Sequence, residues 1–536
     1  MKNKFFIVVA LLFSLIGCKE KDNDPSVVKS VECEEDEIVL DMFEGREVSV
    51  VVLPENAEDK HYEWEILDNS IASVSENMFT GLKPGETWAV VFNVLSPDKK
   101  DSLHIVVKDF NIAISCEKDT VEMFLYSQEN IAVSVTSDEV SDLSFSWIVA
   151  DTTIAAANEN VIDSKIPGKT WAYVVSNANQ YVKDSILIVV KDYPKKSIDF
   201  SDENIHYEGR IVFDEKGATY TYPGSSFSTE FTGTSVSGLF NTKKAYYWVE
   251  IDNQEPYKFT TGKKTQYVEE SGTNPGTFWL AKNLKPGKHT VKVTLCSEAI
   301  TLSSAPKFFG FVVDENSELS KPSPKPYKFE FLGNSITCGY GIEVTKPSYH
   351  FDDTSSNFCK SYSYLTAKEF HADVMVVARS GIGVYRNYGN EAGYGLLPEN
   401  YEKTWLKSST NWDFSKYIPD VVFINLGTND TYDMSTFSSE NFKKAYGDFL
   451  TTILSHYPNA KIVLLTGSMM TNSVLNVIKP ILDELQSEYG SDSHPIYRFD
   501  FKPTNGIGAD YHPCAAQQAQ MAEDLIQFLK ENVIQK

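Results

Sequence analysis

The sequence predicts a multidomain protein in which three β-sandwiches precede a C-terminal α/β/α domain with a parallel sheet. Three patterns in the 536 residues lead to this fold class. Residues 28–192 hold two copies of one β-rich segment, and residues 198–316 hold strands of alternating polarity. Residues 327–536 alternate buried strands with amphipathic helices. A chain of this length holds about three to five domains, so these patterns account for most of it.

Residues 1–18 have the features of a secretory signal, because two lysines precede an apolar run that is too short to span a bilayer. Leu15–Cys18 reads Leu-Ile-Gly-Cys and resembles a lipobox, where cleavage occurs before an acylated cysteine. The resemblance implies a secreted lipoprotein that Cys18 anchors to the outer membrane, at the surface of a Gram-negative cell. Residues 19–27 form a charged tether, which is either an export tag or a simple linker.

Residues 28–109 and 110–192 are two copies of the same segment, and Pro84–Trp88 returns 83 residues later as Pro167–Trp171. Each copy alternates short β-branched runs with turn signals, which predicts an antiparallel sandwich with the repeated tryptophans in its core. The pattern resembles bacterial Ig-like domains. The resemblance implies two independent domains that hold the following region away from the membrane, with glycan binding as the alternative role.

Residues 198–316 keep the β pattern but lose the repeat. Tyr246–Ile251 and Val291–Leu295 alternate apolar with polar side chains, as half-buried strands do, and no segment of helical period interrupts them. A β-sandwich, in particular a jelly roll, is therefore expected. Residues 317–326 are rich in proline and predict a stiff, extended linker.

Residues 327–536 contain several continuous apolar runs, which are typical of parallel strands covered on both faces. Examples are Asp373–Ala378, Val421–Ile424 and Lys461–Leu465, and helices of period 3.6 lie between and after them. A further run, Phe329–Gly333, ends directly at a serine flanked by glycines. In such sheets functional sites form at the carboxyl ends of the strands, so the residues that follow these runs are the candidates.

Four candidate residues follow from this rule. Ser335 lies in Gly-Asn-Ser-Ile-Thr-Cys-Gly-Tyr-Gly, Gly381 in Arg-Ser-Gly-Ile-Gly, and Asn429 in Leu-Gly-Thr-Asn-Asp. His512 lies in Asp-Tyr-His-Pro, just before the last helix. Each motif alone is compatible with an ordinary turn, cap or loop. Together they supply a nucleophile, a base and two hydrogen-bond donors, which indicates acyl transfer.

These motifs resemble the SGNH or GDSL-like hydrolases, and more specifically carbohydrate esterase family 2 of the acetylxylan esterase type, in which a jelly roll precedes the hydrolase. The resemblance implies that Ser335 is the nucleophile and His512 the general base. It also implies that Gly381 and Asn429 bind the oxyanion together with the Ser335 amide. The implied reaction removes O-acetyl groups from plant-type polysaccharides such as xylan or glucomannan, through an acetyl-enzyme.

The chain departs from the superfamily pattern at two positions. Asn334 stands where the serine motif usually has aspartate, and Ala509 stands where a third triad member is usual. Asp510 is a candidate third member or a residue that orients His512. Some members of family 2 instead use a Ser-His pair with a backbone carbonyl behind the histidine. Tyr511 is a candidate wall of the substrate site.

Charge and cysteine spacing limit the possible partners. A formal charge of -25 argues against nucleic-acid binding, and the seven cysteines match no metal motif. Neither metal nor cofactor is expected, and the cysteines are expected as buried thiols, although a Cys338–Cys359 bond stays open. The expected partners are an acetylated polysaccharide or oligosaccharide and, through Cys18, a membrane. The alternatives are a non-catalytic surface glycan-binding protein and an SGNH esterase or lipase that acts on another acyl ester.

Overall fold

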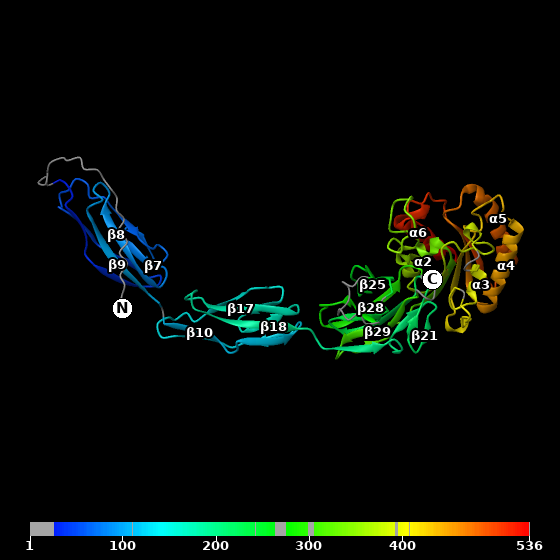
Figure 1. The fold of residues 1–536 in the computed structure, drawn as a ribbon, viewed down its shortest axis with the longest axis horizontal. Coiled ribbons are helices and arrows are strands. Elements are labelled where there is room, and N and C mark those ends of the chain that lie inside the picture. The colour runs from blue at the N-terminus through cyan, green and yellow to red at the C-terminus, as the bar shows by residue number, and fades with distance from the viewer. Residues whose placement is uncertain are drawn as a thin grey trace. The chain divides into compact units, whose positions relative to one another are not determined.

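The computed structural model describes residues 26–109, 111–241, 243–262, 275–298, 305–391, 395–406 and 408–534. The predicted signal, with Cys18, and most of the charged tether lie outside these residues. The chain divides into two compact units, Met1–Lys191 and Asp192–Lys536, which are called here the N-terminal and the C-terminal unit (Figure 1). No helix in the described part of the chain is long and apolar enough to cross a membrane.

The N-terminal unit consists of strands and repeats one pattern twice. In the first copy the strands are β1 (Ser30–Cys33), β2 (Glu37–Asp41), β3 (Gly45–Glu47), β4 (Val50–Leu53), β5 (Tyr62–Ile66), β6 (Ala72–Ser75), β7 (Met78–Gly81), β8 (Gly85–Asn93) and β9 (Lys100–Lys108). In the second they are β10 (Ile112–Cys116), β11 (Thr120–Phe124), β12 (Gln128–Asn130), β13 (Val133–Ser137), β14 (Phe145–Val149), β15 (Ala155–Asn158), β16 (Val161–Ser164), β17 (Gly168–Ser176) and β18 (Lys183–Lys191).

Each copy is built around a four-stranded sheet, with strand order β2-β9-β8-β5 in the first and β11-β18-β17-β14 in the second. β2 runs parallel to β9, and β11 runs parallel to β18, so the expectation of a purely antiparallel arrangement is wrong at one pair in each copy. The repeat itself is confirmed strand by strand. The assignment of the copies as Ig-like domains stays a prediction.

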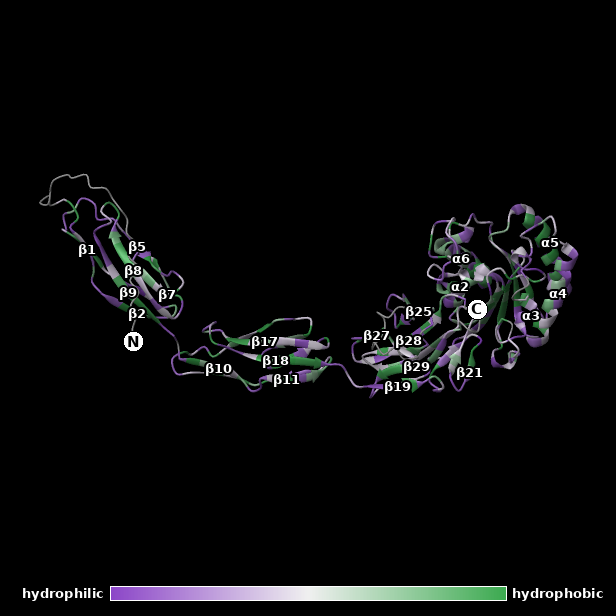
Figure 2. Ribbon diagram, in the orientation of Figure 1, coloured by the Kyte–Doolittle hydropathy of each residue, from purple (hydrophilic) through white to green (hydrophobic). Residues whose placement is uncertain are grey.

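The repeated tryptophans differ in burial. Trp64 is half-buried and packs edge-on against Phe79 at a ring-centroid distance of 4.8 Å. Trp88 and Trp171 instead keep 46% and 45% of their surface exposed. They alternate along β8 and β17 with buried neighbours, so they point to the outer face of the sheet. The expectation that these two lie in the core is therefore wrong. Alternate residues of β17 and β18 are buried in an apolar cluster, and Figure 2 shows hydrophobic stretches along both strands.

The C-terminal unit begins with a β-sandwich of two six-stranded sheets. Its strands are β19 (Lys195–Asp199), β20 (His206–Glu208), β21 (Val212–Asp214), β22 (Gly217–Thr219), β23 (Ser226–Gly233), β24 (Val236–Phe240), β25 (Tyr246–Ile251), β26 (Tyr257–Thr260), β27 (Gly276–Ala281), β28 (Gly287–Leu295), β29 (Lys307–Asp314) and β30 (Leu319–Ser320). Aromatic side chains fill its core, where Phe227 stacks on Phe308 at 3.8 Å between centroids. The jelly-roll assignment of this sandwich stays a prediction.

The predicted linker is bound to the sandwich. β30 pairs with β23, and Lys325 Nζ lies 2.6 Å from Glu208 Oε1. The segment 317–326 therefore contacts the sandwich at these two points, and its assignment as a linker between two domains stays a prediction. Proline made the segment extended, as predicted, but an extended segment can also add to the edge of a sheet.

A parallel sheet of order β32-β31-β33-β34-β35 forms the rest of the unit. Its strands are β31 (Tyr327–Gly333), β32 (Ala372–Ala378), β33 (Val421–Asn425), β34 (Lys461–Thr466) and β35 (Ile496–Asp500). The helices are α1 (Ser335–Cys338), α2 (Tyr362–Glu369), α3 (Leu397–Tyr401), α4 (Ser439–His456), α5 (Asn472–Tyr489) and α6 (Ala515–Asn532), with short 3₁₀ turns at Phe358–Lys360, Tyr388–Asn390, Phe414–Lys416 and Ala509–Tyr511.

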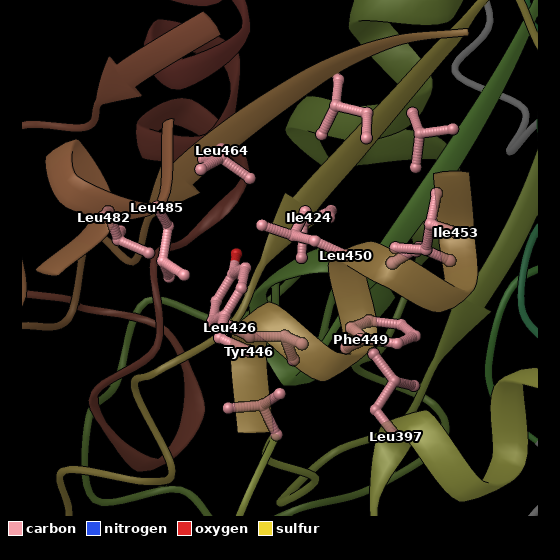
Figure 3. Packing of buried hydrophobic residues seen from close by; sticks show 14 of the residues in the cluster. Leu397, Ile424, Leu426, Tyr446, Phe449, Leu450, Ile453, Leu464, Leu482 and Leu485 are labelled. Atoms are coloured by element: carbon pink, nitrogen blue, oxygen red, sulfur yellow. The ribbon is translucent and has the colours of Figure 1, made fainter. Parts of the chain in front are cut away.

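Two apolar clusters hold the helices on opposite faces of this sheet. Figure 3 shows part of the first, in which Ile424 of β33 and Leu464 of β34 face Leu450 of α4 and Leu482 of α5. Residues of α2 and α6 join the second cluster, on the other face. The α/β/α architecture predicted from continuous apolar runs is confirmed, and it places the carboxyl ends of all five strands at one edge.

The sandwich and the α/β/α region share a buried interface. Arg210 of the sandwich is fully buried, and its Nη2 lies 3.4 Å from Glu330 Oε1 in β31, while Nη1 donates to the carbonyls of Tyr401 and Lys403. Tyr222 of the sandwich is part of the apolar cluster that includes α4 and α5. The six cysteines in the described residues are free thiols, so Cys338 and Cys359 are not bonded.

Candidate active site

Ser335 is the first residue of α1, directly beyond the carboxyl end of β31. Asn334 caps this helix, because its Oδ1 accepts a hydrogen bond from the Ile336 N–H at 3.0 Å. The Asn334 side chain also donates from Nδ2 to the Asn425 carbonyl at 3.2 Å, which ties the turn to β33. Gly339 ends the helix at φ 70°, a conformation that favours glycine. This tight turn fixes Ser335, whose surface is 7% exposed.

His512 faces Ser335 in the geometry of a general base. Its Nε2 lies 2.8 Å from Ser335 Oγ. Its Nδ1 lies 3.0 Å from the Ala509 carbonyl and 3.2 Å from the Asp510 carbonyl. Because carbonyl oxygens only accept, Nδ1 carries the proton and Nε2 is left to accept from the serine hydroxyl. The two residues lie 177 positions apart in the chain, and the fold brings them into contact.

The Asp510 carboxylate bonds elsewhere. Its Oδ2 accepts from the Tyr340 hydroxyl at 2.6 Å, and its Oδ1 lies 2.8 Å from His350 Nδ1. The Tyr340 ring stacks on the His512 ring at 4.2 Å between centroids. Asp510 therefore holds Tyr340, and Tyr340 supports one face of the imidazole. Neither residue was among the candidates from the sequence: Tyr340 stands within the serine motif, where its position was a usable signal, whereas no motif marks His350.

Burial and hydrogen bonding set the protonation of these groups. Burial lowers the pKa of His512 below its usual value, although the Ala509 and Asp510 carbonyls and the Asp510 charge act in the opposite direction. Burial acts to raise the pKa of Asp510, but hydrogen bonds from Tyr340 and His350 outweigh it and keep that pKa below the usual range. At neutral pH His512 is thus a neutral base beside a charged carboxylate.

Gly381 and Asn429 follow β32 and β33, the two strands that flank β31 in the sheet. Gly381 has φ 81°, and its carbonyl accepts from the Tyr388 N–H at 2.8 Å. Asn429 Nδ2 donates one hydrogen to the Ile382 carbonyl at 2.7 Å, which leaves its second hydrogen for a ligand. The N–H groups of Ser335 and Gly381 have no acceptor among the described residues. These three donors therefore remain available to a ligand, and their role as oxyanion donors stays a prediction.

Asp430 joins the two donor loops. Its buried carboxylate accepts from the N–H groups of Val384, Tyr385 and Arg386 at 2.8 to 3.2 Å. Burial raises the pKa of Asp430, and these hydrogen bonds counteract the rise. Asp430 belongs to the Asn429 motif, but the motif alone does not indicate this role.

Tyr511 precedes His512 and keeps 66% of its surface exposed, so its role as a substrate wall stays a prediction.

Away from Ser335 and His512, the side chains of His206, Glu208 and Asp373 lie close enough to share a metal ion. However, Lys292 and Lys325 place their ammonium groups 2.9 and 2.6 Å from Glu208, so the protein's own cations occupy that position.

Comparison with known families matches both parts of the C-terminal unit. The family "Carbohydrate esterase 2 N-terminal" matches residues 207–323, and the "GDSL-like Lipase/Acylhydrolase family" matches residues 331–523. The first match covers the β-sandwich from β20 onward, without β19, together with most of the predicted linker. The second covers Ser335, Gly381, Asn429 and His512.

Three curated relatives align with about 62% of the chain. A protein named Cellulase/esterase CelE from Acetivibrio thermocellus is 31% identical over 341 residues, and the chain covers 40% of that relative. Two proteins from Cellvibrio japonicus named acetylxylan esterase / glucomannan deacetylase are each 26% identical, and the chain covers 91% and 89% of them. The chain thus spans less than half of the first relative and most of the other two.

Solved structures give the same result. A family two carbohydrate esterase from Clostridium thermocellum in complex with cellohexaose is 29% identical, with a TM-score of 0.54 over 61% of this chain and 99% of that one. A family two carbohydrate esterase from Cellvibrio japonicus has a TM-score of 0.56 at 24% identity over 63% and 97% of the two chains, which shows a shared fold. Residues 207–323 are thus similar to the N-terminal domain of family 2 carbohydrate esterases, and residues 331–523 are similar to the GDSL-like hydrolases.

Proposed function

We propose that the protein is a serine esterase that removes O-acetyl groups from a plant-type polysaccharide such as xylan or glucomannan. The observation that carries the proposal is the 2.8 Å contact between Ser335 Oγ and His512 Nε2, beside amide donors that have no acceptor in the described structure. Two relatives named acetylxylan esterase / glucomannan deacetylase support the proposal that the acyl group is acetyl and that the substrate is a glycan. A related esterase in complex with cellohexaose supports a sugar chain as ligand.

The proposed reaction has two halves. His512 Nε2 takes the proton of Ser335 Oγ as that oxygen attacks the acetyl carbonyl, and the N–H groups of Ser335, Gly381 and Asn429 bind the resulting oxyanion. The tetrahedral intermediate collapses, His512 gives its proton to the ester oxygen of the sugar, which leaves as a hydroxyl, and an acetyl-enzyme remains on Ser335. His512 then deprotonates a water that attacks the acetyl group. Acetate leaves, and the proton returns to Ser335.

The carbonyls of Ala509 and Asp510 replace a carboxylate behind the histidine. They hold the Nδ1 proton and so fix the tautomer and the ring orientation. They supply no full negative charge, so the imidazolium that forms during attack gains less stabilisation than in a charged triad. The reaction is therefore proposed to run on a Ser-His pair.

The test is acetate release from acetylated xylan, acetylated glucomannan and nitrophenyl acetate. Ser335→Ala and His512→Ala are each expected to remove nearly all activity, and the double variant should lose no more than either single one. A single variant that kept more than about a tenth of wild-type turnover would refute the assignment. Wild-type cleavage of long-chain acyl esters in preference to acetyl esters would instead point to a lipase.

We further propose that Cys18, which lies outside the described residues, carries a lipid anchor at the outer membrane, with the two repeats as a spacer. The lipobox-like Leu-Ile-Gly-Cys sequence supports this anchor. Cys18→Ser is expected to abolish labelling by palmitate in growing cells. Labelling of that variant at the wild-type level would contradict the anchor and leave the esterase assignment untouched.

A further inference from the structure

One peptide group of the proposed oxyanion site, Ser380–Gly381, is hydrogen-bonded to a charged side chain. Its N–H is the Gly381 donor, and its carbonyl accepts from Arg379 Nη1 at 2.9 Å. In a trans peptide the carbonyl and the N–H point in opposite directions. The guanidinium therefore aims the Gly381 N–H away from itself.

The neighbouring peptide groups are fixed as well. The Ser380 N–H donates to Glu298 Oε2 at 2.9 Å, and the Gly381 carbonyl accepts from Tyr388 at 2.8 Å. The Ile382 N–H closes the turn on the Arg379 carbonyl at 3.2 Å. With a fixed peptide on either side, the Gly381 N–H keeps one direction without any partner of its own.

Glu298 comes from the β-sandwich, three residues beyond β28, and not from the hydrolase. Its Oε2 also lies 3.9 Å from Sγ of Cys338, the last residue of the helix that begins with Ser335. One carboxylate from the sandwich thus contacts the turn of the oxyanion glycine and the helix of the nucleophile. Burial raises its pKa, while the Ser380 hydrogen bonds and the Arg379 charge oppose the rise and nearby Asp353 adds to it.

We propose that Glu298 and Arg379 are positioning residues that orient the Gly381 amide toward the oxyanion. The inference rests on the esterase function proposed above and deepens it, because a residue of the sandwich would then help to orient an oxyanion donor of the hydrolase. Oxyanion donors stabilise the transition state only when they already point at it, since reorienting them during the reaction consumes the gain. A loosened Gly381 amide should therefore slow turnover and leave ground-state binding nearly unchanged.

The experiment compares Glu298→Ala and Glu298→Gln in the full chain. Glu298→Ala removes the acceptor of the Ser380 N–H and is expected to lower kcat about 10- to 100-fold, less than or equal to the loss from deleting a whole donor with Asn429→Ala. KM for nitrophenyl acetate should change less than about threefold. Glu298→Gln keeps an acceptor oxygen and should restore most of the turnover.

A boronic acid inhibitor reports on the oxyanion directly, because it forms a tetrahedral adduct on the serine with an oxygen in the oxyanion site. Its inhibition constant should rise in Glu298→Ala by the same factor by which kcat falls. Glu250→Ala is the matched control. Glu250 is another sandwich carboxylate that reaches the hydrolase, where it bonds Tyr364 and Lys368, away from the donor loops.

Three results would overturn the inference: wild-type kcat in Glu298→Ala, an unchanged boronate constant in that variant, or an equal loss in Glu250→Ala. If Glu298→Ala does not fold, Arg379→Met gives the same test, since it frees the Ser380 carbonyl and should lower kcat in the same range. An inactive wild type would refute the esterase function itself. An active wild type with an inactive Ser335→Ala and a fully active Glu298→Ala would refute only the positioning role.

Discussion

At the scale of single residues, the site depends on the groups that accept a hydrogen bond from His512 Nδ1. Backbone carbonyls hold Nδ1, and the nearby Asp510 carboxylate is committed to Tyr340 and His350. Asp510→Ala is therefore expected to lower kcat/KM by no more than about 10- to 30-fold, far below the ~10⁴-fold effect of disabling a triad acid. A loss near 10⁴-fold in a folded Asp510→Ala variant would make Asp510 the third member of a triad.

The pH dependence follows from the same contacts. Burial lowers the pKa of His512, so the neutral, active base is present at lower pH than for a free histidine. The rising limb of kcat/KM against pH should thus have its midpoint below about 6.5. The Asp510 charge raises this pKa, so Asp510→Ala should move the midpoint further down. An upward shift in that variant would contradict this electrostatic account.

The sequence allowed the candidate site residues to be predicted, but not the residues that hold them in place through hydrogen bonds. Ser335, Gly381, Asn429 and His512 each lie in a recognisable motif, so these residues could be named as candidates before any geometry was known. Glu298 bonds Ser380 across 82 positions of the chain, and no local pattern marks such a contact. Contacts of this kind join residues far apart in the chain, so they cannot be predicted from a short sequence pattern.

At the scale of elements, the turn after α1 sets the spacing between nucleophile and base. Gly341 has φ 53°, and a Cβ there would lie 2.3 Å from Ala509 Cβ. Ala509 carries the carbonyl that orients His512. Gly341→Ala should therefore shift the base and lower kcat, by up to about 100-fold for a displacement near 1 Å. Nitrophenyl acetate turnover, with unfolding followed in parallel, measures the effect.

Gly389 offers the matched control for this substitution. It has φ 64°, so alanine meets similar backbone strain there, but no atom lies within 4 Å of the added Cβ. Gly389→Ala should keep near-wild-type turnover. Equal losses in both variants would mean that strain in the chain, and not the contact with Ala509, explains the effect.

The sheet shows which elements a pattern can identify. β31 to β34 are buried on both faces and read as continuous apolar runs, so they were predictable. β35 lies at one edge of the sheet and mixes Tyr497, Arg498 and Asp500 with apolar residues, so it could not be predicted from a continuous apolar run. β32 is the other edge strand, but it is buried along its whole length, so the partial exposure of β35 and not its edge position explains the weaker signal.

At the scale of the whole molecule, the C-terminal unit contains the entire proposed site, and its sandwich is part of the fold of the hydrolase. Glu330 is fully buried in β31 and bonds Arg210 and Tyr401. Burial raises the pKa of Glu330, and the Arg210 charge opposes that rise. Removing Arg210 would leave this carboxylate without its cation, which typically destabilises a protein by about 3–5 kcal/mol.

Two truncations test this division of the chain. Residues 192–536 form a compact unit with its own apolar clusters, so this fragment should fold and keep kcat/KM for nitrophenyl acetate within about twofold of the full chain, with Ser335→Ala as the blank. Residues 327–536 lack Arg210 and Tyr222, so this shorter fragment should be insoluble or inactive. Activity per folded molecule and thermal unfolding measure both outcomes. A soluble, fully active shorter fragment would show that the hydrolase folds without the sandwich, and an inactive 192–536 fragment would show that the repeats contribute to catalysis.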